Sequence, residues 1–222
     1  MAQPKGGRFG LPAPDAELSA LRAKYVGKEV WVYGGGKFSC SRKNSTSWLT
    51  ALPTEPVQVL AVERLRGTFP VSPVKRSGVL PPQKVKNPLR LTLRLSPNYA
   101  VTEWGYSGSV DSHPKAVDCR QVSETYLNGA DLEKNFSLTP PSAATRKALA
   151  PLLNPQRAAS EIGLTHEQLL WLRGIPESPV GDLKTILSAP VWLWYGLPGR
   201  GDNVFYFQND RVVKVDVPSM GP

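Results

Sequence analysis

The stretch from Leu89 to Leu95 limits most strongly what this chain can fold into. Four leucines alternate there with Arg90, Thr92 and Arg94. A period of two puts successive side chains on opposite faces of a β-strand, so one face of this strand is expected to be buried and the other wet. The segment therefore predicts a sheet.

Other segments in the first half predict further short strands around this one. We expect strands near residues 30–33, 57–62, 99–106 and 119–122, separated by turn residues. The 22 prolines and 19 glycines also favour short strands and many turns, because Pro lacks the amide donor and Gly loses the most backbone entropy. A short helix is expected after Asp15, and residues 39–47 are expected to form an exposed polar loop. Short strands at this spacing predict a small barrel.

A change in composition predicts two modules in an α+β chain. Residues 137–155 are rich in Pro, Ser and Ala and carry one weak helical pattern. We therefore expect a flexible lead at residues 1–16, a β-rich barrel domain at 17–136, a linker at 137–156 and an ααββ domain at 157–219.

The second module has clear signals for where its helices begin and end. Thr165 with Gln168 predicts a capping box at the start of a helix, and Gly174 followed by Pro176 predicts its end. A second helix is expected near residues 182–187. Strands are then expected at 191–195, 204–207 and 212–215, the last two joined by a turn at 208–211.

These motifs resemble the SmpA/OmlA (BamE-like) family in their order and spacing. The corresponding segments are a helix start at 163–165, a helix stop at 174–176, a Trp and Tyr strand at 192–195, and a strand and turn at 207–213. The resemblance implies a helix pair on an antiparallel sheet, in the bacterial envelope, that acts by protein contacts without catalysis. Residues 25–31 and 57–60 loosely resemble an SH3-type barrel.

The aromatic strand of the second module is the predicted protein-binding site. Trp192 and Trp194 share one face of this strand, whereas Tyr195 lies on the other. Two alternatives remain open here. The tryptophans pack on the helix pair as core residues, or they point outward and form an aromatic contact surface.

Positive charge is concentrated in the first module. Residues 1–136 carry 19 basic and 11 acidic side chains, and residues 137–222 carry 8 and 7. A run of bases without an acid makes up the candidate anion or nucleic-acid site: Arg64, Arg66, Lys75, Arg76, Lys84, Lys86, Arg90 and Arg94. One interpretation is a nucleic-acid site of salt-dependent affinity, and a second is a solvated strand face with a Pro-rich basic loop that keeps the protein soluble. Anionic envelope polymers or lipid head groups are a third class of candidate partner.

No set of side chains in the sequence predicts catalysis or metal binding. His113 is expected in a turn and His166 on the surface of a helix, and neither has a nucleophile or acid placed to work with it. Two cysteines and two histidines without zinc-site spacing predict no metal, and we expect no cofactor. The sequence therefore predicts a binding protein and not an enzyme.

The cysteines bear on where the protein works. Cys40 and Cys119 are expected beside strands of one module, where a disulfide would indicate an oxidising compartment; two reduced thiols are the alternative. No apolar stretch is long enough to span a membrane, and the first residues lack the apolar core of a signal peptide. We expect a periplasmic or secreted protein whose signal has been removed, or alternatively a cytoplasmic one.

Overall fold

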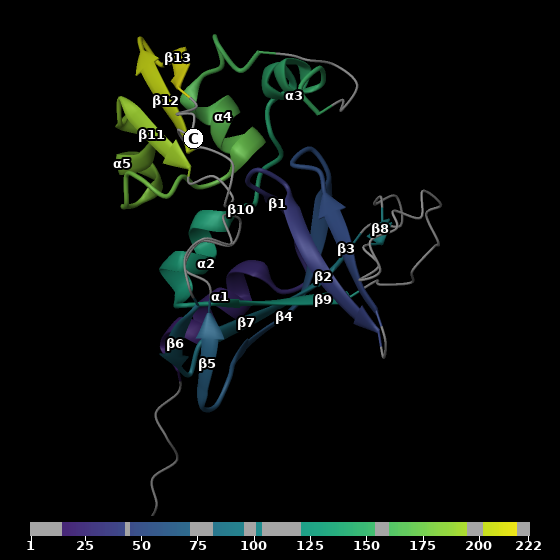
Figure 1. The fold of residues 1–222 in the computed structure, drawn as a ribbon. Coiled ribbons are helices and arrows are strands. Elements are labelled where there is room, and N and C mark those ends of the chain that lie inside the picture. Colours follow the sequence, from purple (N-terminus) through teal and green to yellow (C-terminus); the bar gives the residue numbers. More distant parts are fainter. Residues whose placement is uncertain are drawn as a thin grey trace, which may run out of the picture.

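The structure is a computed structural model that describes residues 15–42, 45–71, 82–95, 101–103, 121–153, 160–194 and 202–216. Within these ranges, only the backbone is described for residues 36–51 and 101–103. Helices and strands are both well represented, so the predicted α+β class is confirmed (Figure 1).

The first part of the chain consists mainly of strands. Its elements, in chain order, are α1 (Ala16–Tyr25), β1 (Glu29–Val32), β2 (Gly36–Arg42), β3 (Ser45–Ala51), β4 (Pro56–Arg64), β5 (Thr68–Val71), β6 (Gln83–Lys86), β7 (Leu89–Arg94), β8 (Val101–Glu103), β9 (Gln121–Tyr126), α2 (Gly129–Asn135) and β10 (Phe136–Ser137). Five of these strands form an antiparallel sheet in the order β10-β1-β4-β7-β9.

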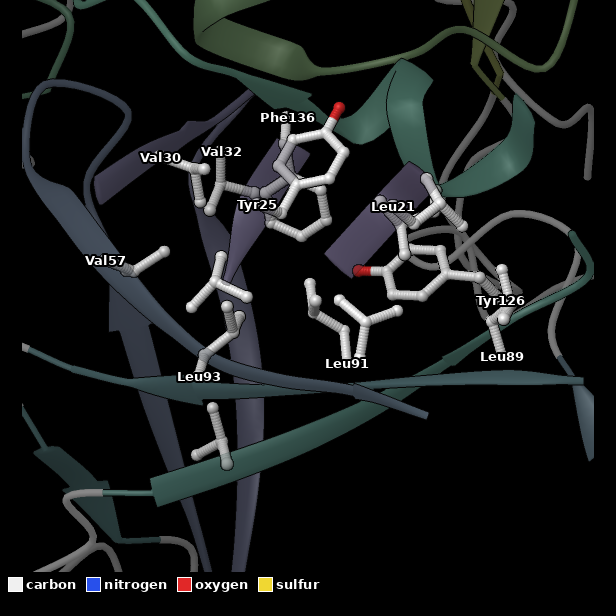
Figure 2. Close-up of a cluster of buried hydrophobic side chains, with 14 of the residues drawn as sticks. Leu21, Tyr25, Val30, Val32, Val57, Leu89, Leu91, Leu93, Tyr126 and Phe136 are labelled. Carbon is white, nitrogen blue, oxygen red and sulfur yellow. The ribbon is translucent and has the colours of Figure 1, made fainter. Parts of the chain in front are cut away.

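The leucines of β7 form the centre of the first core, as their alternation predicts. Leu89, Leu91 and Leu93 are almost completely buried, whereas Arg94 is exposed. Figure 2 shows their side chains grouped with those of Leu21 and other residues from α1, β1, β4 and β9. The opposite face of the sheet is polar, because the intervening residues of β7 point away from this core.

Helix α1 begins and ends where the sequence indicates. Asp15 caps it, since its carboxylate accepts a hydrogen bond from the Leu18 amide at 3.0 Å. Gly27 follows the helix with a φ of 81°, a left-handed conformation that favours glycine. Its amide donates to the Val59 carbonyl at 2.8 Å, which holds the end of α1 against β4.

Two expectations for the first part are corrected by the structure. The predicted polar loop at 39–47 is wrong for residues 39–42 and 45–47, because they belong to β2 and β3, which pair with each other there. Backbone hydrogen bonds make this ladder, so an apolar alternation was not needed to form it. No closed barrel is found among the described residues, since the five-stranded sheet ends at β10 and β9, although β2 lies beside β9.

The second part of the chain places helices on an antiparallel sheet. Its elements are α3 (Ala143–Leu149), α4 (His166–Arg173), α5 (Leu183–Ser188), β11 (Val191–Trp194), β12 (Asn203–Gln208) and β13 (Arg211–Asp216). The strands pair in the order β11-β12-β13. The predicted capping box of Thr165 and Gln168 is present, and Gly174 caps the other end of α4 with a φ of 80°.

Helix α3 lies in the predicted linker, and it packs on α4. Leu149 is fully buried, and Ala148 and Leu152 pack against the second core. The two parts also meet at Tyr33, whose ring centroid is 4.6 Å from that of Trp171. The Gly34 amide donates to the Trp171 carbonyl at 2.7 Å, so the loop after β1 contacts α4 directly.

Candidate functional site

The sheet of β11, β12 and β13 has one face against α4 and α5, and no described helix packs on its other face. Trp192, Phe205 and Phe207 belong to the helix side, in one core with leucines of α4 and Ile186 of α5. The Trp192 side chain is fully buried, and its Nε1 donates to the Ile186 carbonyl at 2.8 Å. The register of the strands then places their alternate residues on the other face.

The three residues of the predicted aromatic site are therefore not found together on the surface. Trp192 and Trp194 are both core residues, with exposed fractions of 0% and 7%, so their rings do not form an outward contact surface. Tyr195 lies outside the described residues. Strand alternation decides this result, because the core needs the large rings and only one face of β11 meets the helices.

The side chains that this register places on the other face are all at least partly accessible, and we call them the open face: Val191, Leu193, Val204, Tyr206, Lys214 and Asp216. Val191 lies opposite Tyr206, and Leu193 lies opposite Val204, so four apolar side chains are neighbours on two strands. Val191 is 40% exposed, and the other three are partly exposed. The strand alternation that buries Trp192 was the sequence signal for this surface.

Charged residues border the open face on β13. Lys214 lies opposite Tyr206, and its Nζ is 5.0 Å from the centroid of that ring. The same Nζ lies 2.7 Å from an Asp216 carboxylate oxygen, and this hydrogen bond raises the pKa of Lys214. The open face thus has an apolar centre on β11 and β12 and a polar edge on β13.

His166 has a structural role that the sequence did not reveal. Its side chain is buried, so the predicted surface role is wrong. Its Nδ1 lies 2.6 Å from an Asp210 carboxylate oxygen, its Nε2 lies 2.9 Å from the Ala189 carbonyl, and its ring stacks on Phe207 at 3.6 Å. His166 therefore ties the start of α4 to the β12–β13 turn and to the end of α5.

Some bases of the predicted basic site form ion pairs within the fold, and others do not. Arg64 of β4 binds the carboxylates of Asp15 and Glu17, which lowers the pKa of both acids. Arg90 of β7 binds Glu63 at 2.6 Å across the sheet. These two arginines are engaged within the fold, so neither is a free cation.

The remaining described bases of that run are exposed. Arg94 contacts the amide oxygen of Gln58 at 3.4 Å. Arg66, Lys84 and Lys86 lie in or beside the β5–β6 pair, and none of them has a carboxylate partner among the residues that the structure describes. Lys75 and Arg76 lie outside the described residues.

The predicted disulfide falls on side chains outside the described part of the structure. Cys40 lies on β2, but its side chain is outside the described part, as is all of Cys119. The backbone gives one relevant neighbour relation, because β2 lies beside β9, which begins two residues after Cys119. His113 also lies outside the described residues.

Within the described ranges, no three His, Cys, Asp or Glu side chains lie close enough together to hold a metal ion. Over the same residues, no helix is both long and apolar enough to span a membrane. Comparisons of the chain with protein-family models, with curated proteins and with solved structures find no match.

Proposed function

We propose that this chain is a non-catalytic binding protein that docks a partner protein on the open face of β11, β12 and β13. The observation that carries the proposal is the group of four adjacent apolar side chains on a sheet face that no described helix covers. Leu193 and Tyr206 belong to this group. Apolar side chains grouped in this way on a surface mark protein contacts more often than singly exposed ones do.

The chemistry of the open face suits a protein partner. Tyr206 offers a rigid ring with a polar tip, and such residues contribute strongly to protein interfaces. Lys214 and Asp216 lie at the edge of the face, where charges steer association and set its orientation. An apolar centre with a polar rim is the usual composition of a protein–protein interface.

The edge of the sheet adds a further exposed apolar group. At the outer edge of β11, the Leu193 amide donates a hydrogen bond to the Ser178 carbonyl at 2.9 Å. Val180, two residues further on, is 85% exposed. The apolar surface near β11 is therefore not limited to the strands themselves.

The order of the elements supports the same kind of protein. Two helices that begin with N-caps at Thr165 and Asp182 precede three antiparallel strands, as the resemblance to the SmpA/OmlA (BamE-like) family implies. That resemblance implies a protein of the bacterial envelope, periplasmic or secreted. We propose this location together with the binding role.

The experiment compares the partners of the intact protein with those of an open-face variant. The variant is Leu193→Ser with Tyr206→Ser, and the control is Leu138→Ser, a leucine just after β10 that is 38% exposed. Each protein is used to capture partners from envelope extract, and captured proteins are quantified by mass spectrometry.

We expect the open-face variant to lose one or more partners that the intact protein and the Leu138→Ser variant retain. With a purified partner, the affinity should fall by about 10- to 100-fold, as it does when residues central to an interface are truncated. A folded open-face variant that keeps every partner at unchanged affinity would refute the proposal.

A further inference from the structure

Strands β5 and β6 form a two-stranded ribbon apart from the large sheet. They pair only with each other among the described strands, with Thr68 opposite Lys86 and Pro70 opposite Lys84. The same register puts Lys84 and Lys86 on one face of the ribbon. Val71, on the other face, is fully buried, so the lysine face is the one turned outward.

The ribbon continues the β4–β7 pair through a kink. Gly67 has a φ of 111° and Asn87 a φ of 52°, and the Asn87 amide donates to the Gly67 carbonyl at 2.7 Å. The Asn87 side chain in turn accepts from the Gly67 amide at 3.0 Å. These bonds fix the base of the ribbon, where Arg66 is exposed beside Gly67.

The ribbon carries positive charge that no acid in the described part of the chain neutralises. The sequence from Leu65 to Pro88 contains no acidic residue. Arg66, Lys84 and Lys86 are exposed and make no ion pair within the described part of the chain. Arg64, next to the ribbon, is bound to two carboxylates by contrast. Three exposed cations are therefore grouped at the ribbon.

We propose that the β5–β6 ribbon binds the phosphate backbone of duplex nucleic acid through Arg66, Lys84 and Lys86. Residues two apart on a strand are separated by about 6.6 Å, so Lys84 and Lys86 reach separate phosphates along one groove edge. A two-stranded ribbon also fits a duplex major groove, which is about 12 Å wide. Phosphate contacts of this kind position a duplex without reading its sequence.

The composition of the lysine face favours a duplex over other polyanions. Binding of single strands relies on aromatic rings that stack on bases, and the lysine face has Thr68 and Pro70 as its other described side chains. Binding to a lipid surface is strengthened by apolar side chains that enter it, and Phe69 and Val85 lie on the opposite face of the ribbon. Duplex nucleic acid requires neither feature.

This site is independent of the proposed protein contact. It uses different residues, and Figure 1 shows β5 and β6 at the end of the molecule remote from β11, β12 and β13. Loss of one activity therefore leaves the other in place.

The test measures binding of the full-length protein to a fluorescent 20-base-pair DNA duplex over a series of salt concentrations. The ribbon variant combines Arg66→Ala, Lys84→Ala and Lys86→Ala. The control removes the same charge elsewhere, by Arg146→Ala, Lys147→Ala and Lys184→Ala, all at exposed positions. Thermal melting checks that each variant is folded, and Lys84→Gln with Lys86→Gln replaces the ribbon variant if that variant unfolds.

For the intact protein, we expect affinity to fall steeply as salt rises. Each phosphate contact contributes about 0.9 to the slope of log affinity against log salt, so the ribbon variant should lose about 2.7 of that slope. The Lys84→Gln, Lys86→Gln variant should lose about 1.8. The control should retain the slope of the intact protein.

Three results would overturn the proposal. The first is no binding of the duplex by the intact protein at 20 mM salt. The second is an equal loss of slope in the ribbon and control variants, because the protein's net charge alone would then explain the salt dependence. The third is tighter binding to the single strand, or to vesicles of phosphatidylcholine and phosphatidylglycerol, that depends on the ribbon lysines.

Discussion

Replacing Arg64 by Met is expected to destabilise the protein and to make its stability less dependent on acid pH. Arg64 lies at the end of β4 and binds both Asp15 and Glu17 of the α1 region. Asp15 also caps α1, and Glu17 accepts a hydrogen bond from the Gly129 amide at 2.8 Å. The guanidinium group therefore joins α1 and α2 to the large sheet.

The size of the effect follows from the exposure of the three side chains. Exposed fractions are 27% for Arg64, 34% for Asp15 and 43% for Glu17, so solvent screens these pairs in part. Exposed ion pairs contribute about 0.2–1 kcal/mol each, and hydrogen bonds to charged groups reach about 1.5–3 kcal/mol when better buried. For two partly exposed carboxylates, we expect Arg64→Met to lower the free energy of unfolding by about 1–2 kcal/mol at pH 7.

The pH dependence has a definite sign. Hydrogen bonding to Arg64 lowers the pKa of Asp15 and Glu17 below their values in the unfolded chain, which are about 3.9 and 4.3. A lowered carboxyl pKa stabilises the folded protein above the unfolded value, and this contribution is lost as pH falls through the folded value. The difference between the intact protein and Arg64→Met should therefore be full at pH 6–7 and shrink below about pH 4.

Urea denaturation of both proteins at a series of pH values measures this difference. The matched control is Arg66→Met, because Arg66 is exposed and has no carboxylate partner among the described residues. The control should change stability by less than about 0.5 kcal/mol at every pH. The reasoning fails if the cost of Arg64→Met is the same at pH 3 and pH 7, or if Arg66→Met costs as much.

Two further predictions concern the buried histidine and the cysteines. His166→Ala should lower the free energy of unfolding by about 3 kcal/mol, because it removes a buried stacked ring and two hydrogen bonds; a loss under about 1 kcal/mol in urea denaturation would contradict this. Cys40 and Cys119 should form a disulfide, since β2 lies beside β9, and reduction should cost about 4 kcal/mol. Two labelled thiols after alkylation without reduction, in protein from its native source, would rule out the disulfide and weaken the envelope location.

Helix caps and strand alternation in the sequence correctly indicated the helix ends and the buried strand faces. The caps at Asp15 and Thr165 and the glycine after α4 act within a few residues, so their effect is readable from the chain alone. The alternation in β7 likewise placed its leucines in the core. The same rule put Trp192 and Trp194 together on one face of β11.

Elements without an apolar period were not predictable in the same way. Strands β2 and β3 are rich in Ser and Thr, and they form by backbone pairing that no side-chain pattern reports. Strands β5 and β6 lie in a segment that reads as a basic, Pro-rich loop, and they exist because each supplies the other's hydrogen bonds. Helix α2 was missed for a related reason, since it is short and carries little apolar pattern.

Only the tertiary structure decided which charged and aromatic side chains remain available for binding. The sequence shows a run of bases without an acid, but Asp15 and Glu17 come from a distant part of the chain to engage Arg64. It shows two tryptophans on one strand, but α4 and α5 determine that this face is the covered one. Pairing and burial depend on residues far apart in the chain, whereas a sequence pattern reports only near neighbours.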